Sequence, residues 1–181
     1  MNLINRFQRL LRIALGICLI ATSSATLQAQ ILDPVSWSFS IHEAEEEGQL
    51  DLVFHAEVEP CWHIYSQFLD DPNGPLPTYF ELEFPSGVEA IGSVEECVPI
   101  VEYDPNFMMD LKFFEEEVNW VQTIRLNEQA DAVVKGYLSF MVCDESRCLP
   151  PEDIDFSFNL NDAPLPPLEN RCPPSKHLCH G

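Results

Sequence analysis

Residues 35–41 read Val35-Ser36-Trp37-Ser38-Phe39-Ser40-Ile41, with an apolar side chain at every second position. Because successive side chains of a β-strand point to opposite faces, this alternation predicts a strand with one buried face. A period of two recurs in five further stretches, whereas helical periodicity is hard to find. These stretches are residues 50–58, 79–84, 118–126, 132–142 and 154–160.

Turn-forming residues separate the alternating stretches. They are Glu47-Gly48, Asp71-Pro72-Asn73-Gly74-Pro75, Pro85-Ser86-Gly87 and Asp104-Pro105-Asn106. Short strands separated by turns, without intervening helices, favour two packed antiparallel sheets over a parallel α/β fold. We therefore expect one all-β sandwich domain over residues 30–162, followed by a proline-rich flexible tail over residues 163–181.

The first 29 residues predict a secretory signal peptide. Arg6, Arg9 and Arg12 form a positive start, a short apolar run follows, and small residues place the expected cleavage after Ala25 or Ala29. A signal anchor is the rival interpretation, but the apolar run is short for a bilayer. No later segment is apolar enough to cross a membrane. We expect an exported protein without stable membrane insertion after cleavage.

The chain is strongly acidic, with 30 acidic and 9 basic residues among 181 and a formal net charge of −21. Cleavage after residue 29 removes three arginines and no acids, which changes the charge to −24. Nucleic acid and anionic lipid surfaces repel such a body, so neither is expected as a partner. The acidic runs at residues 43–47 and 115–117 are expected to be solvated turns, and neither resembles a calcium loop.

Cys143 and Cys148 flank the four polar residues Asp144-Glu145-Ser146-Arg147. A connection of four residues is a common hairpin length and would place the two cysteines opposite each other on neighbouring strands. Directly opposed residues have Cα atoms about 4.5 Å apart, within the range that a disulfide accepts. The spacing therefore suits both a closed disulfide and an open dithiol.

Two interpretations of this pair follow from its spacing, a structural staple and a redox switch. A bridge that closes so small a loop removes little chain entropy, and exposed or strained bridges are the labile ones, so the redox interpretation is favoured. A zinc site is not expected, because the nearby sequence offers no further Cys or His. Arg147 favours a thiolate while Asp144 and Glu145 oppose it, and the sequence leaves that balance open.

Three stretches resemble the N-terminal periplasmic domain of the thiol:disulfide interchange protein DsbD, in its stand-alone Bacteroidota type. The hairpin motif is the most specific of them, and the other two match early strands and the cap loop of that family. They are Phe140-Met141-Val142-Cys143-Asp144-Glu145-Ser146-Arg147-Cys148-Leu149-Pro150-Pro151, then Trp62-His63-Ile64-Tyr65-Ser66-Gln67 with Gly74-Pro75-Leu76-Pro77-Thr78, and Glu102-Tyr103-Asp104-Pro105-Asn106-Phe107.

The resemblance implies an immunoglobulin-like antiparallel sandwich in the periplasm. It implies a protein-disulfide reductase or interchange component, without a cofactor, that relays electrons from a membrane thiol-disulfide reductase to periplasmic thioredoxin-like proteins. Cys143 and Cys148 would be the catalytic pair, with Cys148 expected to bond to partners. Tyr103 and Phe107 are both candidates for an aromatic cap over the sulfurs. The family is also associated with cytochrome c biogenesis.

The family continues into a multi-helix membrane domain and a thioredoxin-like domain, whereas this chain stops at Gly181. We expect either a separate membrane protein as the electron donor or a different role for this copy. The first alternative function is a non-catalytic immunoglobulin-like binding module whose disulfides are structural.

The second alternative is a periplasmic metal-handling protein that uses the tail. Its ligands would be Cys172, His177, Cys179 and His180, but their spacing is unlike common zinc sites, and a tail disulfide is the favoured interpretation. We expect no metal. Cys61 and Cys97 are expected to form a structural disulfide, with burial as small apolar groups as the alternative.

Overall fold

The computed structural model describes residues 32–127 and 133–173. The expected signal peptide lies outside the described residues, as do three of the four candidate metal ligands of the tail. Within the described ranges, no helix is long and apolar enough to cross a membrane.

Strands account for all the regular secondary structure in the described part of the chain. They are β1 (Val35–Glu43), β2 (Gln49–Val58), β3 (His63–Tyr65), β4 (Tyr79–Glu83), β5 (Val88–Glu96), β6 (Ile100–Asp104), β7 (Met109–Phe114), β8 (Glu117–Leu126), β9 (Val133–Phe140), β10 (Val142–Cys143) and β11 (Glu152–Asn159).

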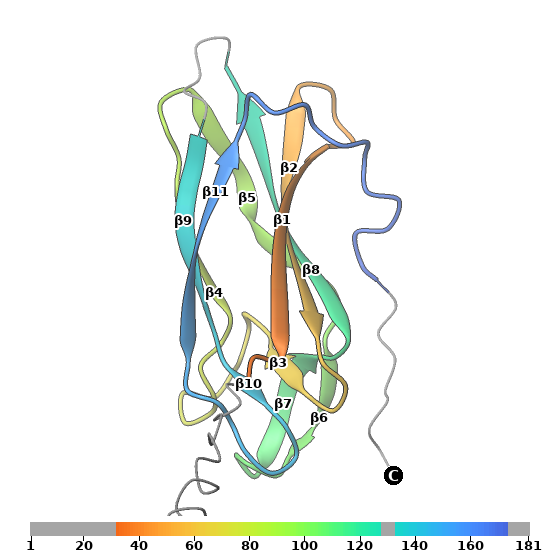
Figure 1. The fold of residues 1–181 in the computed structure, drawn as a ribbon, viewed down its shortest axis with the longest axis vertical. Coiled ribbons are helices and arrows are strands. Elements are labelled where there is room, and N and C mark those ends of the chain that lie inside the picture. The colour runs from red at the N-terminus through yellow and green to blue at the C-terminus, as the bar shows by residue number, and fades with distance from the viewer. Residues whose placement is uncertain (1–31, 128–132, 174–181) are drawn as a thin grey trace, which may run out of the picture. The chain divides into compact units, whose positions relative to one another are not determined.

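The strands form three antiparallel sheets, in the orders β1-β2-β8-β5, β11-β9-β4 and β10-β3-β7-β6. The first two form the two layers of a sandwich, and the third lies at its lower end in Figure 1. The alternating stretch at residues 35–41 forms most of β1, which pairs with β2 from Val35 opposite Val58 to Glu43 opposite Leu50. The predicted all-β, immunoglobulin-like antiparallel sandwich is confirmed.

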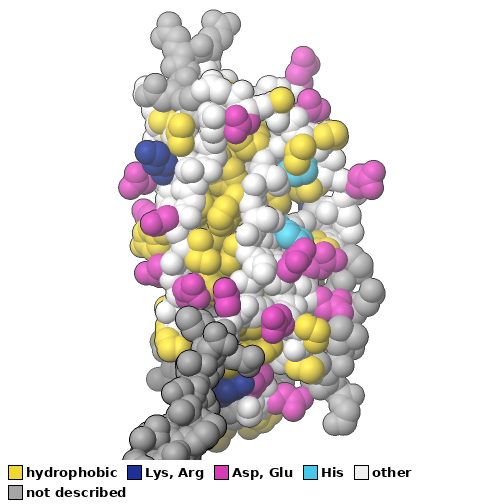
Figure 2. Space-filling model, viewed as in Figure 1, with side chains coloured by type: hydrophobic (Ala, Val, Ile, Leu, Met, Phe, Trp, Pro, Cys, Tyr) yellow, Lys and Arg dark blue, Asp and Glu magenta, His cyan; other side chains and the backbone are white. Residues whose placement is uncertain are grey.

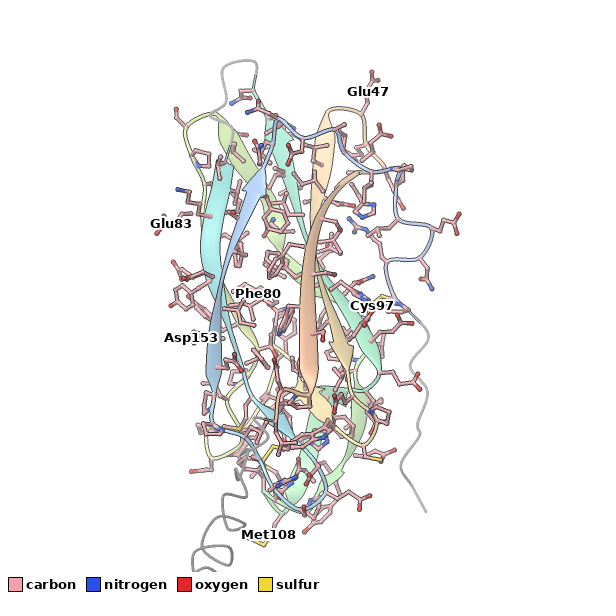
Figure 3. The ribbon with its side chains drawn as sticks, viewed as in Figure 1. Glu47, Phe80, Glu83, Cys97, Met108 and Asp153 are labelled. Atoms are coloured by element: carbon pink, nitrogen blue, oxygen red, sulfur yellow. A yellow bond between two sulfur atoms is a disulfide. The ribbon has the colours of Figure 1, made fainter. Side chains whose placement is uncertain are left out.

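Aromatic side chains fill the space between the two layers. Phe54 of β2 packs against Phe80 of β4 and against Phe156 and Phe158 of β11, with ring centroids 4.8–5.2 Å apart. Trp120 of β8 is fully buried, and its ring lies 5.7 Å from that of Phe80. Figure 3 shows Phe80 between the two sheets. Burial of apolar rings from both layers is the main force that holds the sandwich together.

A second, smaller apolar cluster lies under the sheet β10-β3-β7-β6. Its buried members are Tyr65, Leu111, Phe113 and Cys143, and its partly buried members are Leu69, Ile100, Phe107, Met109, Met141 and Cys148. Both cysteines of the hairpin therefore belong to a packed core rather than to a loop in solvent.

Residues 163–173, the described part of the tail, lie along the sheet β1-β2-β8-β5. Leu165 exchanges two backbone hydrogen bonds with the end of β1, through the carbonyl of Ile41 and the N–H of Glu43. Further on, Arg171 forms ion pairs with Asp51 and Glu95. Pairing with an edge strand and charge complementarity on an acidic body hold this segment in place.

The expected bridge between Cys61 and Cys97 is wrong, because Cys97 bonds to Cys172, with the two Cα atoms 5.4 Å apart. Cys61 is disulfide-bonded as well. The segment that ends in Arg171 brings Cys172 to the end of β5, which is a contact between residues 75 apart in sequence. The bond also removes Cys172 from the candidate metal ligands, and the described residues contain no cluster of three or more potential ligands.

Candidate redox site

Cys143 and Cys148 form a disulfide across a four-residue turn, with their Cα atoms 4.0 Å apart. The two residues make an antiparallel bridge, and the N–H of Leu149 donates to the carbonyl of Val142 at 3.0 Å. The chain thus reverses direction within the turn and returns beside β10. This is the hairpin arrangement that the four-residue spacing predicts.

The turn is held by the carboxylate of Asp144. Its Oδ1 accepts the backbone N–H groups of Ser146 at 2.7 Å and Arg147 at 2.9 Å. Burial opposes ionisation of Asp144, but these hydrogen bonds and those from the two side chains lower its pKa. Arg147 also lies over the ring of Trp62, 5.7 Å from its centroid, while Glu145 is exposed. The positive charge of Arg147 is thus shared with a carboxylate and an aromatic face.

The two sulfur-bearing residues differ in burial. Cys143 has no exposed surface and packs with Tyr65, Leu111 and Phe113, whereas Cys148 is partly exposed. Exchange requires a thiolate to reach a sulfur atom from solvent or from a docked protein. Of the two residues, Cys148 is the accessible one.

The loop between β6 and β7, residues 105–108, lies against the hairpin and is called the cap loop here. Asp104, the last residue of β6, directly precedes the loop. The Oδ1 atom of Asp104 accepts hydrogen bonds from the backbone N–H groups of Asn106 at 2.7 Å and Phe107 at 3.3 Å. Met108 has a positive φ of 57° and donates its N–H to the carbonyl of Asp104 at 2.8 Å. Figure 3 shows Met108 and Glu47 at opposite ends of the sandwich.

The two candidate cap aromatics occupy different places. Phe107 is partly buried, packs into the cluster that contains both hairpin cysteines, and meets the ring of Tyr65 edge-on at 6.0 Å. Tyr103 is 61% exposed on the outer face of β6. Of the two candidates, Phe107 therefore packs in the same apolar cluster as the hairpin cysteines, and Tyr103 does not.

A buried polar network lies beneath the cap loop. The hydroxyl of Tyr65 donates to Asp104 Oδ2 at 2.5 Å, and His63 Nε2 lies 3.3 Å from the same oxygen. Cys143 is paired directly opposite His63. Burial lowers the pKa of His63, and Asp104 opposes that shift; burial and the bond to Asp104 raise the pKa of Tyr65.

This network connects the cap loop to β3, the strand that pairs with the Cys143 strand β10. The sequence places Asp104 in a predicted turn and His63 in a stretch that resembles an early strand. Both descriptions hold locally. Neither indicates that the Asp104 carboxylate accepts a hydrogen bond from the cap loop and also lies within hydrogen-bond distance of Tyr65 and His63. The signal that could have pointed to this role is the aspartate at the start of a predicted turn, two residues before an asparagine.

The comparisons with known proteins agree with this description. The family described as "Thiol:disulfide interchange protein DsbD, N-terminal" matches residues 28–160. The fold and the site together define a class of protein, which is an immunoglobulin-like sandwich with a disulfide hairpin at one end. The chain belongs to the family of DsbD N-terminal domains. No curated protein matches this chain.

Three solved structures are similar in fold. The reduced N-terminal domain of DsbD from Neisseria meningitidis has 15% identity and a TM-score of 0.43, covering 67% of this chain and 84% of its own. The complex of that domain with the N-terminal domain of PilB, from the same organism, has 12% identity and a TM-score of 0.45, with coverage of 74% and 90%. The GAE domain of GGA2p from Saccharomyces cerevisiae has 13% identity and a TM-score of 0.38, with coverage of 74% and 94%.

Proposed function

We propose that this domain exchanges disulfides with partner proteins in the periplasm through Cys143 and Cys148. In this scheme it takes electrons from a membrane thiol-disulfide reductase and passes them to thioredoxin-like proteins. Family membership supports thiol-disulfide interchange as the activity. The observation that carries the proposal is the disulfide between the buried Cys143 and the partly exposed Cys148, in a turn to which the cap loop is hydrogen-bonded. A role in cytochrome c biogenesis stays a prediction.

Reduction of the domain begins with attack by a donor thiolate on Sγ of Cys148. The bond between the two hairpin sulfurs breaks, and Cys143 leaves as a thiolate that takes up a proton. The second thiol of the donor, as its thiolate, then attacks the donor sulfur of the mixed disulfide. Cys148 leaves as a thiolate that takes up the second proton, and the donor is left oxidised. Two electrons and two protons have entered the hairpin.

Transfer onward runs the same steps in reverse. The Cys148 thiolate attacks a disulfide of the acceptor, and one acceptor sulfur leaves as a thiolate. Cys143, held about one disulfide length away, then attacks Sγ of Cys148 and releases the reduced acceptor. The burial of Cys143 suits it to this resolving step, because only an intramolecular partner needs to reach it.

Exposed apolar side chains beside the cap loop offer a docking surface for the partner. Val101 and Tyr103 on β6 and Met108 in the cap loop are 60–76% exposed. The surroundings are acidic: Figure 2 shows Asp and Glu spread over the visible face, with few Lys or Arg. An apolar contact on β6 and the cap loop would let a protein approach that this charge does not attract.

The two alternatives are less well supported. A purely structural bridge would close a five-residue separation, which stabilises a fold weakly. A metal site in the tail would lack the Cys172 thiolate, which is bonded to Cys97.

Trapping of a mixed disulfide tests the proposal. The Cys143→Ser variant should accumulate a covalent adduct with a thioredoxin-like protein through Cys148, because the resolving thiol is missing. The Cys148→Ser variant is the matched control and should trap little, since Cys143 is buried. Equal trapping by both variants, or by neither, would contradict the proposed exchange.

A further inference from the structure

A single hydrogen bond joins the cap loop to the cysteine turn. The side-chain amide of Asn106 donates from Nδ2 to the backbone carbonyl of Asp144 at 2.9 Å, a contact between residues 38 apart. Asp144 directly follows Cys143 in the chain. The hydrogen bond therefore ends at the residue next to Cys143, one of the two cysteines of the hairpin disulfide.

The Asp144 carbonyl is available to Asn106 because of the way the turn is closed. In an ordinary β-turn the N–H of residue i+3 bonds to the carbonyl of residue i. Here the N–H of Arg147 donates instead to the Asp144 side chain, at 2.9 Å, as does the N–H of Ser146 at 2.7 Å. The Asp144 carboxylate thus accepts the hydrogen bond from Arg147 that the Asp144 carbonyl accepts in an ordinary turn. The carbonyl can then accept a hydrogen bond from the cap loop.

Asn106 is fixed at its other end as well. Its backbone N–H donates to Asp104 Oδ1 at 2.7 Å, and the next residue is Phe107. Phe107 packs in the apolar cluster that contains Cys143 and Cys148, so movement of the cap loop out of this cluster carries Asn106 with it. Such opening has to break the bond between Asn106 and Asp144.

We propose that the Asn106–Asp144 hydrogen bond is a latch that holds the cap loop closed and limits the rate at which thiols reach Cys148. The inference rests on the proposed function and assigns Asn106 as a positioning residue for it. A protein partner that offers an N–H to the Asp144 carbonyl replaces the Asn106 amide and opens the cap loop. A small dithiol without an N–H has to wait for spontaneous opening.

The test is the rate at which dithiothreitol reduces the Cys143–Cys148 disulfide in the oxidised protein, followed by alkylation and mass spectrometry. The Asn106→Ala variant should react roughly three- to ten-fold faster, the factor expected for loss of one neutral hydrogen bond. The matched control is Asn159→Ala, which loses a similar bond, from Nδ2 to Asp162 Oδ1 at 3.0 Å, at the end of β11. Its rate should equal that of the wild type.

A second pair of variants separates a latch from a general structural effect. Phe107→Ala removes the ring itself and should accelerate reduction by itself. In that background Asn106→Ala should add nothing, because no ring remains to be held. The Asn106→Asp variant keeps the size and the backbone bond to Asp104 but has no donor at neutral pH, and it should react like Asn106→Ala.

Equal rates for Asn106→Ala, Asn106→Asp and the wild type would overturn the latch, as would a full additional acceleration in the Phe107→Ala background. In either case the disulfide still reacts and the proposed function stands. A disulfide that dithiothreitol fails to reduce in every variant would overturn the proposed function and the latch together.

Discussion

Cys143 is paired directly with His63, across the two antiparallel strands β10 and β3. The imidazole of His63 lies 3.3 Å from Asp104 Oδ2, so the buried cysteine has a buried histidine and carboxylate as neighbours. Burial lowers the pKa of His63 from its ordinary value of 6.5, while Asp104 and Asp144 oppose that shift. The neutral imidazole is therefore the form that the folded protein favours.

The pKa of His63 predicts a loss of stability in mild acid. The unfolded chain takes up a proton near pH 6.5, whereas the folded protein takes it up only at lower pH, so unfolding binds a proton in this window. The contribution of His63 to the free energy of unfolding should be fully present above about pH 6.5 and should decrease as the pH drops towards the pKa of His63 in the folded protein. Urea unfolding at several pH values measures it.

The His63→Gln variant should flatten this slope, because glutamine keeps a polar side chain that does not titrate. The matched control is His55→Gln on β2 of the first sheet, where His55 bonds to Asn119 at 2.7 Å. A slope that survives His63→Gln would contradict the assignment of the acid sensitivity to this residue.

The two disulfides with known partners should contribute unequally to stability. Replacement of Cys97 and Cys172 by alanine opens a 75-residue separation and should cost about 4.5 kcal/mol of unfolding free energy, by the chain-entropy relation. The same change at Cys143 and Cys148, five residues apart, should cost about 2 kcal/mol. Guanidinium unfolding compares them. A larger loss for the hairpin pair would identify it as a staple.

Gly136 in the middle of β9 should not tolerate a side chain. A Cβ atom there would collide with the carbonyl oxygen of Glu81 and lie 2.7 Å from the ring of Phe156. Gly136→Ala should therefore destabilise the protein by about 1–3 kcal/mol, the range for overpacking. Lys135→Ala, at the exposed neighbouring position, should change stability by less than about 0.5 kcal/mol. Equal effects in thermal unfolding would contradict the close packing of β9 against β4.

Tyr103 and Phe107 should separate partner docking from shielding. Tyr103→Ala should leave reduction by dithiothreitol unchanged, since Tyr103 is exposed on β6 and does not pack against the sulfurs. It should slow exchange with a thioredoxin-like protein by raising the KM. Phe107→Ala should accelerate dithiothreitol reduction. Identical kinetic effects of the two changes would contradict their separate roles.

The sandwich strands were predictable because their alternation is local. The stretches at residues 35–41 and 118–126 each carry one buried face, and both form strands of the first sheet. Strand β5 was not predicted, because a register irregularity between Ile91 and Glu95 and a positive φ of 70° at Gly92 interrupt its alternation. The short strands β3 and β10 carry too few residues to show a period.

The hairpin was predictable from the spacing of two cysteines, but its surroundings were not. The cap loop meets the turn through Asn106 and Asp144, which are 38 residues apart. Cys97 meets Cys172 only because the tail crosses the sheet after β11. Both contacts follow from topology, and neither has a signature in the local sequence.

The central claim is that the Cys143–Cys148 disulfide opens and closes under the conditions in which the domain works. Equilibration of the protein in graded thiol buffers, with alkylation of free thiols and mass spectrometry of the hairpin peptide, measures its reduction potential. The account predicts half-reduction at a potential above about −300 mV, with Cys97–Cys172 still closed. A hairpin that stays oxidised below about −300 mV, in the range of structural disulfides, would contradict the account.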